Sequence, residues 1–147
     1  MPAVADVSSR SITELTSLAG RAAVVTGSGR GLGKAIARRL AEAGADVLIG
    51  DIDETLARQA AADLDGAGAS RVLGTAMDVT DSTTVKAAAD LATREFGRID
   101  IWVNNAGIFP CVPLQEMSDE LWDQVLAVNT RGVIAGAREA ARCMRAG

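Results

Sequence analysis

The sequence predicts an α/β fold in which helices cover both faces of a doubly wound parallel sheet. Two observations support this class. Short apolar runs alternate four times with longer segments whose apolar residues recur at helical spacing. The apolar runs lack an alternation of polar and apolar residues, as expected for parallel strands that are buried on both faces. The 147 residues are 48% hydrophobic and 23% charged, a balance typical of one globular domain.

The first strand and its helix follow a polar segment. Residues 1–17 show no sustained periodicity, and we expect a flexible N-terminal arm there. Residues 22–26 (AAVVT) form an apolar run with β-branched residues, which predicts a buried strand. An amphipathic helix that ends at Gly44 is predicted next, because apolar residues repeat at spacings of four, four and three. These residues are Leu32, Ile36, Leu40 and Ala43.

A helix with clear ends separates the second and third strands. Residues 46–50 (DVLIG) predict the second strand, and Asp53 and Glu54 mark the start of the helix after it. We expect this helix to end at Gly66. Its apolar positions are Leu56, Ala60 and Leu64. Residues 71–77 (RVLGTAM) predict the third strand, which a central glycine weakens.

The fourth strand lies between two further helices. Thr80 or Asp81 is expected to cap the first of them, which ends at Gly97. Its apolar residues are Val85, Ala89, Ala92 and Phe96. Residues 99–103 (IDIWV) predict the strand, and a loop with two prolines follows. Ser118 then caps a long helix whose acidic first turn is favourable for the helix dipole.

Composition excludes several kinds of partner and chemistry. The chain has 15 basic and 19 acidic residues, a net charge of −4, and we expect no binding to nucleic acid. No apolar stretch approaches the ~20 residues that span a bilayer, and the N-terminus lacks the pattern of a signal peptide. Two isolated cysteines, Cys111 and Cys143, are typical of a reducing compartment, so we expect a cytoplasmic protein with no membrane partner. The absence of histidine excludes histidine-based catalysis, and we expect no metal site.

Residues 26–33 (TGSGRGLG) form a glycine-rich loop between the first strand and its helix. Glycines let the backbone turn sharply and approach a ligand, and the start of a helix attracts phosphate. The loop is not a P-loop, which would need glycine at Ser28 and a hydroxyl residue at Ala35. It also fails the G-x-G-x-x-G pattern, which would need glycine at Leu32 or Lys34. A G-x-G-x-G loop, as in many S-adenosylmethionine-dependent methyltransferases, does fit and stays open as an alternative.

The loop also fits the pattern T-G-x-x-x-G-x-G, and three other motifs follow it in order. The matching residues are Thr26, Gly27, Gly31 and Gly33, then Asp78-Val79, then Asn104-Asn105-Ala106-Gly107 (NNAG), then Val128-Asn129 with Gly132 (V-N-x-x-G). Together these motifs resemble the cofactor-binding half of the short-chain dehydrogenase/reductase family, over about residues 18–147. The resemblance implies a Rossmann-type fold with strand order 3-2-1-4. It also implies an NAD(P)-dependent oxidoreductase that transfers a hydride between the nicotinamide and an alcohol or ketone substrate.

The resemblance assigns roles to individual residues. Asp51, 18 residues after Gly33, would accept hydrogen bonds from the adenosine ribose, and its charge favours NAD over NADP. Arg30 is a basic loop residue of the kind that NADP-dependent relatives carry, so NADP is the alternative. Asp78 would bind the adenine amino group, and the backbone of Asn129, the candidate catalytic residue, would hold a water molecule of the proton relay. The candidate cofactor-binding residues are Thr26, Gly27, Ser28, Gly29, Arg30, Gly31, Leu32, Gly33, Asp51, Ile52, Asp78, Val79, Asn105, Ala106 and Gly107.

The family's catalytic tyrosine has no counterpart, because the chain contains no Tyr. In the family, a serine and a Tyr-x-x-x-Lys motif follow a fifth strand, which this chain does not reach. We therefore expect residues 18–147 to be an incomplete dinucleotide-binding domain, truncated after the fourth strand and its long helix and inactive alone. The apolar edge strand or the long helix would then promote self-association. A catalytically inactive nucleotide-binding or partner-binding module is the main alternative, and a methyltransferase-like domain is the lesser one.

Overall fold

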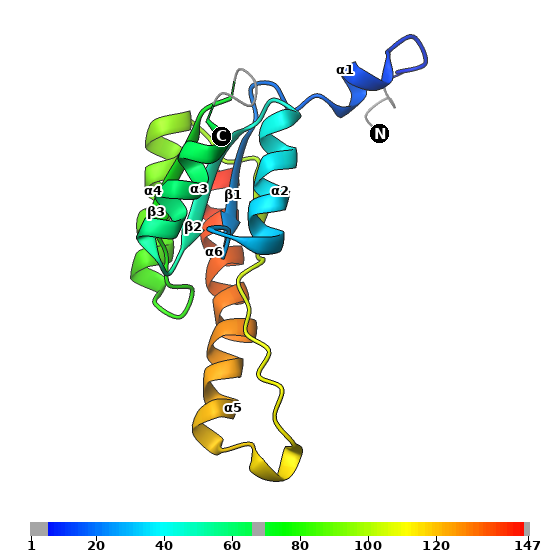
Figure 1. The fold of residues 1–147 in the computed structure, drawn as a ribbon. Helices are drawn as coiled ribbons and strands as arrows, with labels where there is room; N and C mark the ends of the chain where they lie inside the picture. The colour runs from blue at the N-terminus through cyan, green and yellow to red at the C-terminus, as the bar shows by residue number, and fades with distance from the viewer. Residues whose placement is uncertain (1–5, 66–69, 146–147) are drawn as a thin grey trace.

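Four parallel strands form one sheet in the computed structural model, which describes residues 6–65 and 70–145 (Figure 1). The strands are β1 (Ala22–Thr26), β2 (Asp46–Asp51), β3 (Val72–Ala76) and β4 (Ile101–Val103). Their order in the sheet is β3-β2-β1-β4, which confirms the doubly wound class and the expected order. The predicted helix end at Gly66 lies outside the described residues.

The register of the strands brings their carboxyl ends to one edge of the sheet. At the end of β1, Thr26 is paired with Gly50 of β2, and Gly50 is paired with Thr75 of β3. On the other side of β1, Val25 is paired with Val103, the last residue of β4. The loops that follow the four strands therefore start next to one another, at the edge where ligands bind in doubly wound sheets.

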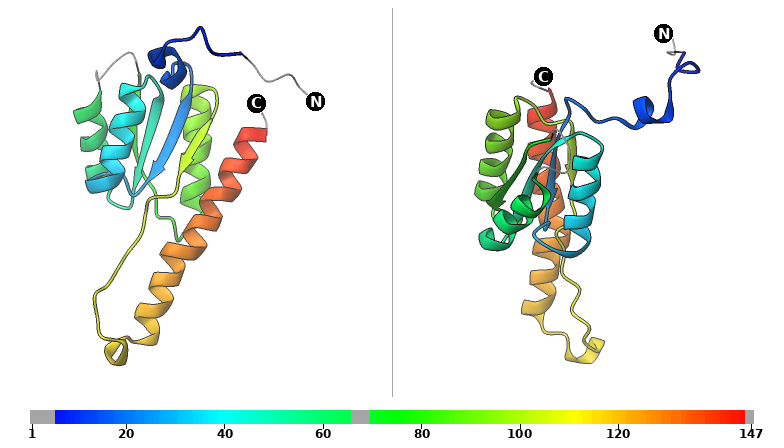
Figure 2. Two further views of the ribbon diagram at one scale, coloured as in Figure 1. Left: turned by 90° about the vertical axis from the view of Figure 1, so that its right-hand side faces the viewer. Right: turned by 45° about the horizontal axis from the view of Figure 1, so that its top comes forward.

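Helices cover both faces of the sheet (Figures 1 and 2). On one face lie α2 (Gly31–Glu42) and α3 (Glu54–Leu64), and on the other lie α4 (Ser82–Phe96) and α6 (Val133–Arg145). Successive residues of a strand point to opposite faces, so each strand contributes to both cores. In β1, Ala23 and Val25 pack in the core with α2 and α3, whereas Val24 packs in the core with α4 and α6.

The side of α2 that contacts the sheet is made of small residues. Its buried residues are Gly33, Ala37 and Ala41. The predicted apolar stripe was therefore only partly right. Ile36 and Leu40 flank the core, but Leu32 is 72% exposed. Spacing alone pointed to the larger side chains, whereas a helix that packs closely on a sheet leaves room only for glycine and alanine.

The ladder of β4 is shorter than predicted, and a side chain accepts one of the backbone hydrogen bonds just before it. The sequence predicted two more residues before Ile101. Instead, the N–H of Ala22 donates to the carboxylate of Asp100 at 2.9 Å, while the N–H of Asp100 donates to the carbonyl of Ala22 at 2.8 Å. The Asp100 carboxylate also pairs with Arg21 at 2.7 Å and with Arg98 at 2.6 Å.

We expect Asp100 to make stability depend on pH. Burial raises the pKa of Asp100, but hydrogen bonds from the Ala22 backbone, Arg21 and Arg98 outweigh burial and lower the pKa below its usual value. A lowered pKa in the folded state stabilises the fold above the unfolded pKa of about 3.9, and this stabilisation is lost as the pH falls through the folded pKa. Asp100→Asn should lower the free energy of unfolding by about 2 kcal/mol at pH 7. In urea titrations the difference from wild type should shrink below about pH 4, and a difference that stays constant to pH 2 contradicts this role.

Most predicted helix ends are confirmed. Asp53 caps α3, and Asp81, rather than Thr80, caps α4, each by accepting hydrogen bonds from backbone N–H groups in the first turn. Gly97 ends α4 in the left-handed conformation with a φ of 82°. Gly44 follows the end of α2 with a φ of 100°. Capping residues and terminal glycines therefore located these ends correctly from sequence.

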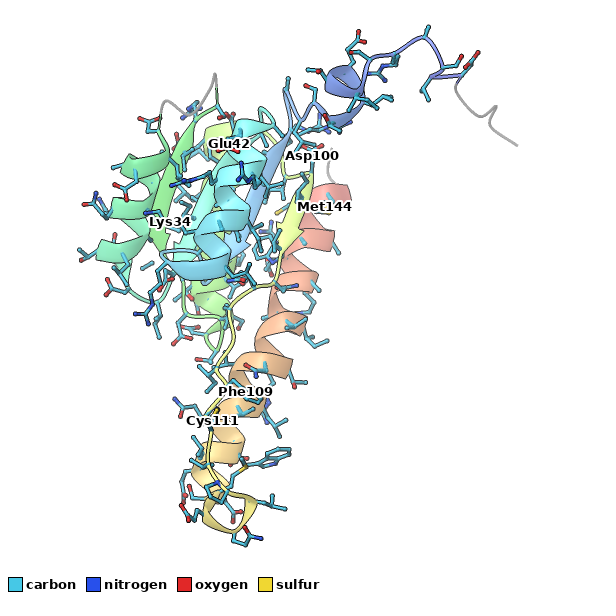
Figure 3. The ribbon with its side chains drawn as sticks, turned by 45° about the vertical axis from the view of Figure 1, so that its right-hand side comes forward. Lys34, Glu42, Asp100, Phe109, Cys111 and Met144 are labelled. Atoms are coloured by element: carbon cyan, nitrogen blue, oxygen red, sulfur yellow. The ribbon has the colours of Figure 1, made fainter. Side chains whose placement is uncertain are left out.

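A long helical segment projects beyond the strand-end edge of the sheet (Figure 1). It consists of α5 (Asp119–Leu126), the π-helical segment η2 (Ala127–Gly132) and α6, and the short 3-10 turn η1 (Leu114–Glu116) precedes it. Ser118 caps α5 as predicted, whereas η2 was not predicted. Figure 3 shows Phe109 and Cys111 on the projecting loop, at the opposite end of the molecule from Asp100 and Met144. Neither this segment nor any other helix in the described residues is long and apolar enough to span a membrane.

The expected N-terminal arm contains a short helix that was not predicted. This helix, α1 (Ile12–Thr16), is stabilised by a capping box in which Ser11 and Glu14 exchange hydrogen bonds. All of its residues are exposed to solvent. The sequence signal for this helix was the S-x-x-E spacing of Ser11 and Glu14. Apolar periodicity is absent because the helix buries no face.

Candidate functional site

A cleft of about 280 Å³ lies at the carboxyl ends of the strands. Nine of the predicted cofactor-binding residues line it, and they come from the loops after all four strands. They are Gly27, Arg30, Asp51, Ile52, Asp78, Val79, Asn105, Ala106 and Gly107. Met77, Ile108 and Val128 complete the lining and were not predicted. Met77 and Ile108 are adjacent to motif residues and Val128 belongs to the V-N-x-x-G motif, which was the signal available in the sequence.

A larger hollow of about 460 Å³ lies elsewhere, on the surface of α5 and η2. Its lining residues are Asp123, Gln124, Leu126, Ala127, Thr130 and Arg131. None of these belongs to the predicted cofactor-binding set. The cleft at the strand ends is smaller, but it combines a glycine loop with carboxylates, so its chemistry makes it the better candidate for a ligand site.

The glycine loop brings the backbone of β1 close to the segment after β4. A Cβ atom on Gly27, whose φ is 60°, would lie 2.7 Å from the Cα of Ala106. A Cβ atom on Gly33 would lie 2.4 Å from the carbonyl oxygen of Gly27. Arg30 occupies the N-cap position of α2 and makes no side-chain capping bond. The start of α2 therefore presents backbone donors at a place where a phosphate can bind.

Thr26 and Asn105 fasten the glycine loop to the segment after β4. The hydroxyl oxygen of Thr26 accepts hydrogen bonds from the backbone N–H groups of Asn105 and Ala106, both at 3.0 Å. The side-chain amide of Asn105 donates to the carbonyl oxygens of Thr26 at 3.0 Å and Gly27 at 2.9 Å. Because Thr26 is only 1% exposed, it supports the cleft from beneath.

Some of the predicted cofactor-binding residues do not line the cleft. Ser28 is fully buried, and its hydroxyl donates to the carbonyl of Val25 at 2.6 Å. The side chain of Ser28 therefore serves the fold, and cofactor binding by Ser28 stays a prediction for its backbone. Gly29 is also buried, and Gly31, Leu32 and Gly33 lie beside the cleft on the first turn of α2.

Two carboxylates border the cleft, at the ends of β2 and β3. Asp51 accepts hydrogen bonds from two backbone N–H groups, at 2.9 and 3.1 Å. Asp78 accepts from the backbone N–H of Thr80 at 2.8 Å and from its hydroxyl at 2.7 Å. A carboxylate has about four acceptor positions, so both groups keep capacity for a ligand. Arg30 lines the same cleft and adds a positive charge to it.

Asn129 lies in η2, where its side chain holds the loop after β4. Its side-chain oxygen accepts from the N–H of Ile108 at 2.9 Å, and its amide donates to the carbonyl of Ile108 at 2.8 Å. The side chain is therefore used for structure, and the catalytic role expected for its backbone stays a prediction. A Cβ atom on Gly132 would lie 2.8 Å from Val79. The V-N-x-x-G motif thus packs η2 against the cleft at two points.

A comparison with protein families tests the resemblance that the motifs suggest. A model of the short chain dehydrogenase family matches residues 21–147. The chain belongs to the short-chain dehydrogenase/reductase family. The Rossmann-type fold and the oxidoreductase family expected from the motifs are therefore confirmed. The comparisons give no support to the methyltransferase alternative or to the inactive-module alternative.

Relatives and solved structures agree with this assignment. The chain is 39% identical over 137 residues to short chain dehydrogenase/reductase dpmpG of Macrophomina phaseolina, covering 92% of this chain and 78% of the relative. It is 46% identical over 116 residues to D-threitol dehydrogenase of Mycolicibacterium smegmatis, covering 78% and 44%. A short-chain type dehydrogenase/reductase from Mycobacterium marinum is 34% identical, with a TM-score of 0.85 and coverage of 90% and 52%. The chain thus spans about half the length of the last two proteins.

Proposed function

We propose that this chain is the dinucleotide-binding part of an NAD(P)-dependent oxidoreductase and that NAD binds in the cleft at the strand ends. One observation carries the proposal: the glycine loop and Asp51 border the same cleft. The start of α2 offers backbone donors for the pyrophosphate, and the Asp51 carboxylate offers acceptors for the ribose hydroxyl groups.

The residues present in the cleft fit such a cofactor. A Cβ atom at Gly27 or Gly33 would meet protein backbone atoms within 2.7 Å, so these two glycines let the loop pack tightly at the edge of the cleft. Asp78 offers an acceptor for the adenine amino group, and Val79 and Ile52 offer apolar surface for the ring. When bound, the nicotinamide supplies or accepts the hydride, while the residues of this chain bind and orient it.

NAD is the expected dinucleotide, because the Asp51 carboxylate would repel the 2′-phosphate of NADP. Two charges about 4 Å apart interact by up to ~4 kcal/mol near a protein surface, and salt reduces this value. We therefore expect the chain to bind NADH at least about tenfold more tightly than NADPH in calorimetric titrations. Arg30 acts in the opposite direction, so Arg30→Ala should weaken NADPH binding more than NADH binding. A wild-type preference for NADPH would contradict the assignment and make Arg30 the dominant charge.

We propose that the complete enzyme acts on an alcohol or a ketone. The relative named D-threitol dehydrogenase supports a substrate with a hydroxyl-bearing carbon. We expect these 147 residues alone to show no turnover, because no tyrosine phenol is present to exchange a proton with the substrate oxygen. An assay of NADH formation with D-threitol and simple secondary alcohols tests this expectation. Measurable NADH formation would contradict it.

We also propose that the chain self-associates through its long helix. Trp122 and Ile134 are 51% and 59% exposed on this helix. Its acidic first turn and its later arginines, Arg131 and Arg138, would face each other in an antiparallel pair of identical helices. Sedimentation velocity should show a dimer, and Trp122→Glu should shift it to monomer. A dimer that survives this substitution would point instead to β4, which lies at the edge of the described sheet.

The proposed compartment is the cytoplasm. Cys111 and Cys143 are both free thiols, and Cys111 is exposed. Exposed free thiols are typical of proteins in reducing compartments. Fractionation of the source cells, with the protein detected by antibody, tests this proposal.

A further inference from the structure

The glycine loop contains one glycine that the pattern T-G-x-x-x-G-x-G does not require. This residue is Gly29, which is buried and does not line the cleft. Its φ is not in the left-handed region, so backbone conformation does not explain it. The surroundings of Gly29 explain why a glycine is present. A Cβ atom on Gly29 would lie 2.9 Å from the Cβ of Leu56 and 3.0 Å from a carboxylate oxygen of Asp51.

The contact between Gly29 and Asp51 is a hydrogen bond to a charged group. The N–H of Gly29 donates to the Oδ2 atom of Asp51 at 2.9 Å, and the N–H of Asp53 donates to Oδ1 at 3.1 Å. The carboxylate thus spans the glycine loop and the turn that leads into α3. Hydrogen bonds to ionised acceptors are stronger than neutral ones, so this contact can fix the loop.

The residue before Gly29 is tied to the same strand. The N–H of Ser28 donates to the carbonyl of Gly50 at 3.0 Å, and the buried Ser28 hydroxyl donates to the carbonyl of Val25. Two successive residues of the loop are therefore held by the end of β2, one by its backbone and one by the side chain of Asp51. The backbone hydrogen bond is made by the N–H of Ser28, so it does not hold the peptide group that carries the Gly29 N–H. The hydrogen bond to the Asp51 carboxylate does hold that group.

We infer that Asp51 is a positioning residue for the glycine loop and that it sets the loop geometry before any dinucleotide binds. This goes beyond a contact with the ribose, and only its consequence for dinucleotide affinity rests on the proposed function. If Asp51 served the ribose alone, replacing it by alanine would remove repulsion and raise NADPH affinity. If it also positions the loop that faces the phosphates, Asp51→Ala loosens the Gly29 amide in the chain without dinucleotide, which the loss of a ribose contact alone would not do.

The direct test measures amide hydrogen exchange in the chain without dinucleotide. Asp51→Ala should raise the exchange rate of the Gly29 amide by at least about tenfold. Asp51→Asn should stay near wild type, because the Asn oxygen can still accept this hydrogen bond. Asp78→Ala is the matched control, since Asp78 borders the same cleft but contacts Thr80. Protection of the Val24 amide in β1 reports whether each variant is folded.

An unchanged Gly29 exchange rate in folded Asp51→Ala would overturn the inference. If Asp51→Ala does not fold, Gly29→Ala takes its place, because the added Cβ atom displaces the same carboxylate. The amide of residue 29 should then exchange at least about tenfold faster, and wild-type exchange would overturn the inference. Failure of the proposed function can be told apart from failure of this inference. If only the proposed function fails, the wild type binds neither dinucleotide, but the Gly29 amide still exchanges faster in Asp51→Ala than in wild type.

Discussion

Thr26→Val is expected to lower the free energy of unfolding by about 3 kcal/mol and to abolish most dinucleotide binding. Valine has nearly the shape of threonine but cannot accept the hydrogen bonds that the Thr26 hydroxyl receives from Asn105 and Ala106. Two backbone donors beneath the cleft would lose their partner, and each such loss costs about 1–3 kcal/mol. Urea unfolding followed by circular dichroism measures the stability, and calorimetry with NADH measures the binding.

Thr26→Ser is the matched control for this substitution. Serine keeps the hydroxyl and loses one methyl group at a site that is 1% exposed, so a loss of about 1 kcal/mol is expected. NADH affinity should stay close to wild type in this variant. Equal effects of Val and Ser on NADH binding would show that the hydroxyl does not hold the cleft together.

Gly33→Ala is expected to have a similar effect on binding for a steric reason. The added Cβ atom would lie 2.4 Å from the carbonyl oxygen of Gly27 and 2.5 Å from the side-chain amide of Asn105. Both neighbours must move, which breaks the two hydrogen bonds that Asn105 donates to the loop. We expect a loss of about 1–3 kcal/mol in stability and no measurable NADH binding.

Gly97→Ala separates the steric effect from the general cost of replacing a glycine. Gly97 has a φ of 82°, and a Cβ atom there would meet nothing within 4 Å. The expected loss is about 1 kcal/mol, because alanine is strained in the left-handed region. NADH affinity should be unchanged, since this residue ends α4 far from the cleft. A normal NADH affinity in Gly33→Ala would contradict the proposed shape of the loop.

The strands and most helix ends could be predicted because their signals are local. Apolar runs marked β1 and β2, and the capping aspartates marked α3 and α4. The predicted start of β4 was wrong because the N–H of Ala22 bonds to the side chain of Asp100 and not to a backbone carbonyl. These two residues are 78 positions apart in the sequence. Strand periodicity carries no information about such a long-range side-chain contact.

The sequence motifs indicated which residues gather around the cleft, but they did not indicate the role of each residue there. Sequence placed Ser28 among cofactor-binding residues, whereas its buried hydroxyl bonds to Val25. The pattern did not show that Asn129 would use its side chain on Ile108. Which residues face a ligand and which hold the loops depends on tertiary packing, and motif spacing reports both kinds alike.

The most direct test of the proposed site is a titration of the isotope-labelled chain with NADH, followed by amide chemical shifts. We predict saturable shifts at the glycine loop, at Asp51 and at residues 105–107, which border the cleft. Amides around Gly97 and Met144, at the opposite end of the sheet, should not shift. The absence of shifts at the loop, or shifts confined to the hollow on α5 and η2, would contradict dinucleotide binding at the strand ends.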